Sequence, residues 1–115
     1  MSDTHDVPVR EITGAALSWA VARAEGDELP RDGSVGIDYA TDWLAAGPII
    51  DREGISVRRF TNQTFWVAYT NRDTAEWIHG RTALEAAMRA YVEHKLGPHI
   101  ALPDTLRSGG GNEQA

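Results

Sequence analysis

The stretch TALEAAMRAYVEHKLGP, residues 82–98, carries the clearest structural signal in the chain. Thr82 and Glu85 have the spacing of a capping box, and Gly97 followed by Pro98 is a helix stop signal. The apolar residues between these signals share one face at helical spacing: Leu84, Ala87, Met88, Tyr91, Val92 and Leu96. The stretch therefore predicts a helix of about four turns that packs against a sheet.

The residues before this helix supply the sheet and a second helix. ISVRRFT (55–61) and TFWVAY (64–69) are β-branched and aromatic runs separated by two polar residues, which predicts an antiparallel hairpin. AEWIH (75–79) can add a third short strand. TGAALSWAVARAEG (13–26) predicts a helix with Thr13 as N-cap and Gly26 after its end. We expect an α+β fold, with a small antiparallel sheet packed by these two helices.

The segment DYATDWLAAGPIIDREGI, residues 38–55, is an irregular connection in this scheme. Thr41 or Asp42 can cap a short turn that runs to Ala46. Gly47 and Pro48 then restart the chain, because proline suits the first position of a helix. The pattern predicts a second short helix, PIIDRE, closed by Gly54.

The length of 115 residues is enough for one domain. With 42% hydrophobic and 24% charged residues the composition is that of a globular protein. We expect a flexible N-terminal arm over residues 1–10, a single α+β domain over 11–106, and a disordered tail over 107–115.

Charge and composition exclude several classes of function. A net charge of −6 and a pI near 5.1 repel phosphate backbones, so no DNA or RNA partner is expected. No run is apolar enough to span a membrane, and the start lacks a secretion signal, which predicts a cytoplasmic protein. The chain has no cysteine, its four histidines are scattered, and no catalytic motif occurs. We therefore expect no enzyme activity, no metal and no cofactor.

The connecting segment, with the two helical stretches, resembles the NinX family of small accessory proteins from the nin region of lambdoid phages. Tyr39, the pair Asp42-Trp43 and the run from Gly47 to Ile55 match the family pattern, whereas Ala46 stands where a glycine is usual. The resemblance extends from Thr13 to Leu106. It implies a phage or prophage accessory protein that acts inside a bacterium, and it carries over no catalytic role.

The aromatic residues and arginines suggest a ligand site. Trp19, Tyr39 and Trp43 can stack on a planar group, and Arg52 or Arg59 can bind phosphate with a planar donor fork. Asp42 and Pro48 complete the candidate set, since a helix starting at Pro48 would leave backbone N–H groups free for an anion.

Four of these candidates also have a structural reading. Trp43 can anchor the connection in the core, and Asp42 can cap a turn. Arg52 can form a solvated cluster with its acidic neighbours Asp51 and Glu53. The Gly47-Pro48 step can simply begin a helix, because acidic residues nearby would repel an anion.

Two functional hypotheses follow. The first is a non-enzymatic binder that sequesters a small nucleotide-like host metabolite or immune signal, as a counter-defence. The second is a protein-interaction module that binds and inhibits a host or phage protein. A homo-oligomer is expected, because Trp19 lies on a second face of its helix and needs cover.

Overall fold

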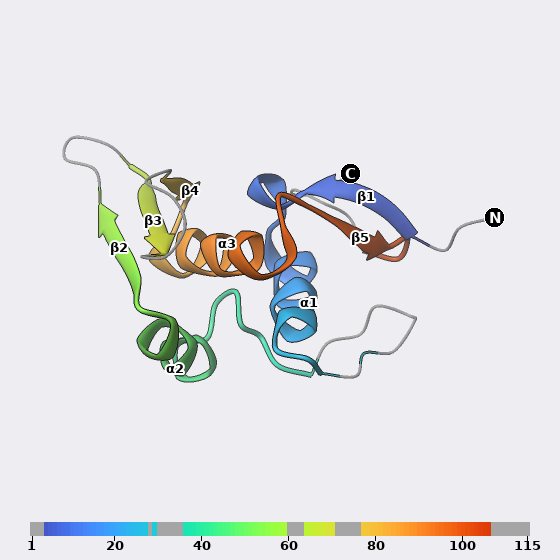
Figure 1. Cartoon of the computed structure of the whole chain (residues 1–115), viewed down its shortest axis with the longest axis horizontal. Helices are drawn as coiled ribbons and strands as arrows, with labels where there is room; N and C mark the ends of the chain where they lie inside the picture. Colours follow the sequence, from blue (N-terminus) through green and yellow to red (C-terminus); the bar gives the residue numbers. More distant parts are fainter. Residues whose placement is uncertain (1–3, 28, 30–35, 60–63, 71–76, 107–115) are drawn as a thin grey trace.

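The computed structural model describes residues 4–27, 29, 36–59, 64–70 and 77–106. The elements follow in the order β1 (Thr4–Pro8), the 3-10 turn η1 (Val9–Glu11), α1 (Gly14–Ala24), α2 (Trp43–Glu53), β2 (Ile55–Arg59), β3 (Trp66–Thr70), β4 (Ile78–Gly80), α3 (Ala83–Leu96) and β5 (His99–Pro103). The fold is α+β, as predicted (Figure 1). The expected hairpin turn and the tail after Leu106 lie outside the described residues.

Helix α3 is the centre of the molecule. In Figure 1 it runs between the antiparallel sheet β2-β3-β4 and the two-stranded sheet β1-β5, and α1 packs against it. Every residue from Leu84 to Val92 is buried, including Glu85 and Arg89. The predicted apolar stripe is present, but the helix buries more than one face because sheet and helix approach it from different sides. The sheet is therefore covered by α3, and α1 lies against α3 instead of sharing the sheet face.

One of the two hydrogen bonds of the predicted capping box is formed as expected at the start of α3. The Thr82 hydroxyl accepts a hydrogen bond from the Glu85 N–H at 3.0 Å, as expected of an N-cap. The Glu85 carboxylate accepts the N–H of Arg81 at 2.7 Å, one residue earlier than in the standard box. The result still satisfies two backbone donors at the start of the helix.

The three-stranded sheet presents one face to α3. A Cβ atom on Gly80 would lie 2.3 Å from the backbone nitrogen of Ala86, so this side of β4 touches the helix. Trp66 is the ladder partner of Gly80, and Arg59 is the partner of Trp66. Directly opposed residues share a face of the sheet, so Trp66 and Arg59 also lie on the α3 side.

Residues 4–10 differ from the expected flexible arm. Thr4–Pro8 forms β1, which pairs antiparallel with β5 from Thr4↔Pro103 to Pro8↔His99. Val7 and Leu102 are buried in the same core cluster as the helices. The pattern THDVP contains a single large apolar residue, and its partner strand lies at the other end of the chain. No local signal therefore marked β1. In β5 the alternation of buried Ile100 and Leu102 with exposed His99 and Ala101 is a strand pattern that the sequence analysis missed.

The connecting segment holds one continuous helix where two short ones were predicted. Asp42 caps α2 by accepting the Leu44 N–H at 3.0 Å, and Gly54 ends it with φ 66°. Pro48 lies inside this helix. Proline removes the hydrogen bond to the Leu44 carbonyl, but Leu44 is 86% exposed, so water can replace it. Burial of Ala46 and Ile49 stabilises the continuous helix despite the proline.

Candidate functional site

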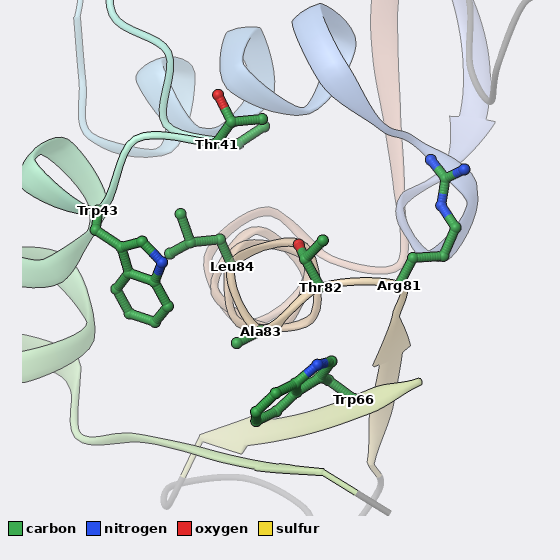
Figure 2. Close-up of a pocket in the computed structure, with 8 residues that line it drawn as sticks. Thr41, Trp43, Trp66, Arg81, Thr82, Ala83 and Leu84 are labelled. Carbon is green, nitrogen blue, oxygen red and sulfur yellow. The ribbon is translucent and has the colours of Figure 1, made fainter. Parts of the chain in front are cut away.

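A pocket opens where α2, β3 and α3 meet. Its volume is about 410 Å³, and its lining consists of Ala40, Thr41, Trp43, Trp66 and the four residues from Arg81 to Leu84. We call it the tryptophan pocket (Figure 2). Ala83 begins α3 and Trp43 begins α2, so the pocket lies where two helices start. Its volume is at the lower end of the range for small-molecule sites.

Two indole rings dominate the pocket. Trp43 is 57% exposed, whereas Trp66 is half-buried on the α3 side of β3. Figure 2 shows the two rings on different sides of the first turn of α3, with Ala83 between them and Leu84 above the Trp43 ring. Indole faces over an apolar floor are suited to stacking on a planar ligand.

The rim of the pocket is polar. Thr41 and Thr82 contribute hydroxyl groups, and the side chain of Arg81 is 78% exposed. The Arg81 guanidinium lies 3.5 Å from the Glu85 carboxylate, longer than a good charge-assisted hydrogen bond. In Figure 2 the guanidinium points away from both indoles. The pocket thus combines aromatic walls with a cation at the opposite end.

Of the predicted site residues, Trp43 lines the pocket and Arg59 lies close to it. Arg59 stands opposite Trp66 in the β2–β3 ladder and shares its face, although it is not a lining residue. Cβ atoms of such pairs are about 5 Å apart, so the long Arg59 side chain can reach the pocket rim.

Trp19 and Tyr39 lie in the core, with 5% and 7% exposure. Burial and nearby acidic side chains raise the pKa of Tyr39, which fits an enclosed phenol. The Trp19 indole N–H has no hydrogen-bond partner among the described residues, and the guanidinium of Arg23 lies 5.7 Å from its ring. Neither ring offers a free stacking surface. Since the chain itself covers Trp19, that residue no longer argues for a homo-oligomer, which stays a prediction.

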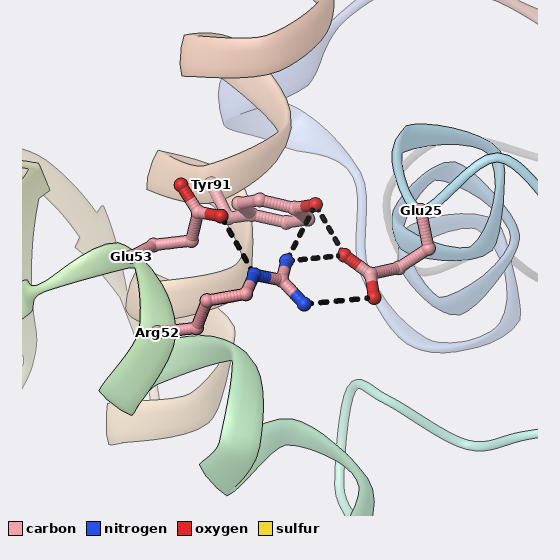
Figure 3. Close-up of polar contacts among 4 residues, drawn as sticks. All are labelled: Glu25, Arg52, Glu53 and Tyr91. Atoms are coloured by element: carbon pink, nitrogen blue, oxygen red, sulfur yellow. Dashed lines mark hydrogen bonds and ion pairs between the residues drawn. The ribbon is translucent and has the colours of Figure 1, made fainter.

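Arg52 is engaged in a polar cluster (Figure 3). Its guanidinium donates to both Glu25 oxygens, at 3.3 Å and 2.6 Å, and to Glu53 at 2.8 Å. It also donates to the Tyr91 hydroxyl at 3.1 Å, while that hydroxyl donates to Glu25. We call these four residues the Arg52 cluster. It joins the C-terminal ends of α1 and α2 to the last turns of α3.

The electrostatics of the Arg52 cluster match this joining role. The hydrogen bonds from Arg52 hold the pKa of Glu25 below its ordinary value of 4.5, against the opposing effect of burial. Burial and the hydrogen bond with Glu25 raise the pKa of Tyr91 well above its ordinary range. At neutral pH the cluster therefore holds an ionised Glu25 and a neutral Tyr91.

Arg52 and Trp43 cannot share a small ligand. They are nine residues apart on α2, which corresponds to a rise of about 14 Å and a rotation of about 180°. Asp42 and Pro48 also differ from the ligand-binding expectation. Asp42 caps α2, and Pro48 lies inside that helix, so no helix start exists there to bind an anion.

Trp66 and Arg81 were missed by sequence reasoning. Trp66 looked like an ordinary strand residue, and Arg81 only preceded the predicted cap of α3. The available signal was Arg81 beside Thr82, because a cation at a helix start is electrostatically unfavourable and suggests another role. The proximity of Trp66 to Trp43 had no signal in the sequence, since it depends on how β3 and α2 pack on α3.

Metal and membrane sites have no candidates in the described part of the chain. No group of three or more histidine and acidic residues there could hold a metal ion. None of the described helices is long and apolar enough to cross a membrane.

Comparison with known proteins gives one finding. A family model described as "Bacteriophage P22, NinX" matches residues 8–95. The match includes the connecting segment, all of α1 and α2, and nearly all of α3. No curated protein sequence matches the chain.

Proposed function

The chain belongs to the NinX family of bacteriophage proteins, and we propose that it sequesters a small nucleotide-like host metabolite or immune signal in the tryptophan pocket. The observation that carries this proposal is the meeting of Trp43 and Trp66 at one pocket with Arg81 on its rim. The protein acts as a phage accessory factor, and its target is a molecule of the bacterial cytoplasm.

The chemistry of the pocket supports a nucleotide-like ligand. Stacking of a base on an aromatic side chain is worth about 1–3 kcal/mol and tolerates any base. An exposed arginine supplies a planar donor fork for a phosphate. The residues that line the pocket include no histidine and no carboxylate, so they offer no general base. Binding without chemistry is therefore our proposal for the tryptophan pocket, and the neighbouring Glu85 carboxylate is engaged with the side chain and backbone N–H of Arg81.

Sequestration sets a requirement on affinity. The protein must hold the signal at its working concentration by mass action, which requires a dissociation constant on the order of nanomolar to low micromolar. At the nanomolar end of this range, dissociation is slow enough for the ligand to stay bound through gentle purification.

Native mass spectrometry tests the proposal. The protein is purified from bacteria with and without an activated nucleotide-signalling defence. We expect an adduct of nucleotide mass that is released on denaturation and is missing in Trp43→Ala. Leu44→Ala is the matched control, because Leu44 neighbours Trp43, is 86% exposed and does not line the pocket. The same adduct in Trp43→Ala, or none in the wild type, would contradict the proposal.

An exposed apolar surface favours a second candidate function. Ile37, Trp43 and Leu44 are 45%, 57% and 86% exposed. Apolar groups so open to water are typical of a protein-interaction site. In this reading the protein inhibits a host or phage protein. Leu44→Asp should then abolish co-purification of that protein, while the small-ligand reading predicts no effect of Leu44→Asp on an adduct.

A further inference from the structure

The tryptophan pocket continues into two neighbouring hollows. The first has a volume of about 400 Å³ and shares Ala40, Thr41, Arg81 and Thr82 with the pocket. The second has about 320 Å³ and shares Gly14 and Thr41 with the first. Thr41 borders all three hollows. The three hollows lie side by side, with lining residues that extend from Trp66, past Arg81, to Asp38, and together we call them the groove.

The middle of the groove has mixed charge. Arg81 and the buried Glu85 both line the middle hollow, and the exposed Arg81 guanidinium lies 3.5 Å from the Glu85 carboxylate. A free anion would meet repulsion from Glu85 as well as attraction from Arg81. A phosphate is therefore held well only when the rest of its molecule contributes binding on either side.

The far end of the groove carries an acceptor. The Asp38 carboxylate accepts hydrogen bonds from the Ser18 hydroxyl at 3.1 Å, from the Thr41 N–H at 3.3 Å, and from the Thr41 hydroxyl. These bonds, the Thr41 hydroxyl foremost, lower the pKa of Asp38, so it is ionised at neutral pH. An ionised carboxylate accepts but does not donate, and it selects ligand hydroxyl or ammonium groups.

We propose that the groove binds a nucleotide whose phosphate is linked to a second, hydroxyl-bearing ring. The base stacks in the tryptophan pocket, the phosphate lies at Arg81, and the hydroxyls of the second ring donate to Asp38. This inference rests on the proposed function and specifies its ligand class. Dinucleotides and nucleotide sugars share this chemistry.

Titration calorimetry with base-matched probes tests the inference. The probes are adenosine monophosphate, ADP-ribose, a diadenosine monophosphate and inorganic phosphate. ADP-ribose and the diadenosine monophosphate carry a second ribose beyond the phosphate, and we call them the two-ring probes. We expect at least one of them to bind about tenfold or more tighter than adenosine monophosphate, because charge-assisted hydrogen bonds to Asp38 are added. Inorganic phosphate should not bind. The tighter two-ring probe distinguishes a dinucleotide from a nucleotide sugar.

A variant of Asp38 tests whether this residue supplies the added affinity of the two-ring probe. Asp38→Asn should remove the advantage of the two-ring probe over adenosine monophosphate, because only the second ring contacts Asp38. Asp51→Asn, which neutralises an exposed carboxylate that does not line the groove, should change neither affinity. The comparison of probes on the wild-type protein decides the matter even if Asp38→Asn unfolds.

Two failures are distinguishable. Equal affinity for adenosine monophosphate and for the two-ring probes overturns this inference and leaves the proposed function standing. No binding of any adenine probe overturns both, because stacking on indole tolerates every base.

Discussion

Replacement by alanine should have opposite effects on the free energy of unfolding at Gly47 and at Gly80. Gly47 lies inside α2, and a Cβ there would meet nothing within 4 Å apart from its chain neighbours and its own helix backbone. Gly47→Ala should therefore raise the free energy of unfolding, but by less than the roughly 1 kcal/mol that glycine costs in a helix interior, because Pro48 opposes a helical conformation at the residue before it. A Cβ on Gly80 would lie 2.3 Å from the Ala86 nitrogen. Gly80→Ala should lower the free energy of unfolding by about 1–3 kcal/mol, because β4 must move away from α3.

Urea denaturation of the two variants and the wild type measures both effects. Each variant serves as the other's control, since the chemical change is the same. A destabilised Gly47→Ala or a neutral Gly80→Ala would show that the packing around that glycine differs from the structure.

At the scale of elements, the Arg52 cluster connects three helices. Arg52→Ala should lower the free energy of unfolding at pH 7 by about 1 kcal/mol, a modest value because half of the side chain is exposed to screening solvent. It should not directly affect ligand affinity, since Arg52 lies far from Trp43 along α2.

The effect of Arg52→Ala should depend on pH. The folded pKa of Glu25 is below the ordinary value of 4.5, so Glu25 contributes stability above that value. This contribution is lost as pH falls through the lowered pKa. The difference between wild type and Arg52→Ala should shrink from pH 7 to acid pH in denaturation experiments. Arg58→Ala, an exposed arginine on β2, provides the control and should show no such change. A difference that grows in acid would contradict the role of Glu25.

Helix α2 illustrates how packing can overcome a local stop signal. Gly47 and Pro48 predicted a break, and proline does remove a hydrogen bond there. Ile49 is nevertheless 2% exposed, and its burial on a continuous helix outweighs the lost bond. Asp42 and Gly54, by contrast, cap and end the helix as their local chemistry predicts.

At the scale of the whole molecule, the net charge of the protein should disfavour binding of a nucleic acid but not of a single nucleotide. The net charge of −6 repels a long polyanion, while a small ligand meets mainly the local charges of its site, which include Arg81 and Glu85. Fluorescence anisotropy of a labelled DNA duplex should show no binding at protein concentrations that saturate the nucleotide probe. Duplex binding that weakens steeply with salt would show that the protein has a basic surface the sequence did not reveal.

Amino-acid chemistry at short range was enough to predict α1, α3, the hairpin and the α+β class. Caps such as Thr82, terminators such as Gly54 and apolar periodicity act within a few residues, so they can be recognised from the sequence alone. The pairing of β1 with β5, the contacts of Arg52 with Glu25 and Tyr91, and the meeting of Trp43 with Trp66 and Arg81 join residues distant in sequence. The contact of Arg52 with its neighbour Glu53 was the local part of that cluster, and it was predicted. Their positions follow from how elements pack around α3, and no local pattern encodes that packing. The candidate pocket belongs to this second class, because its two indoles and its arginine come from three different parts of the chain.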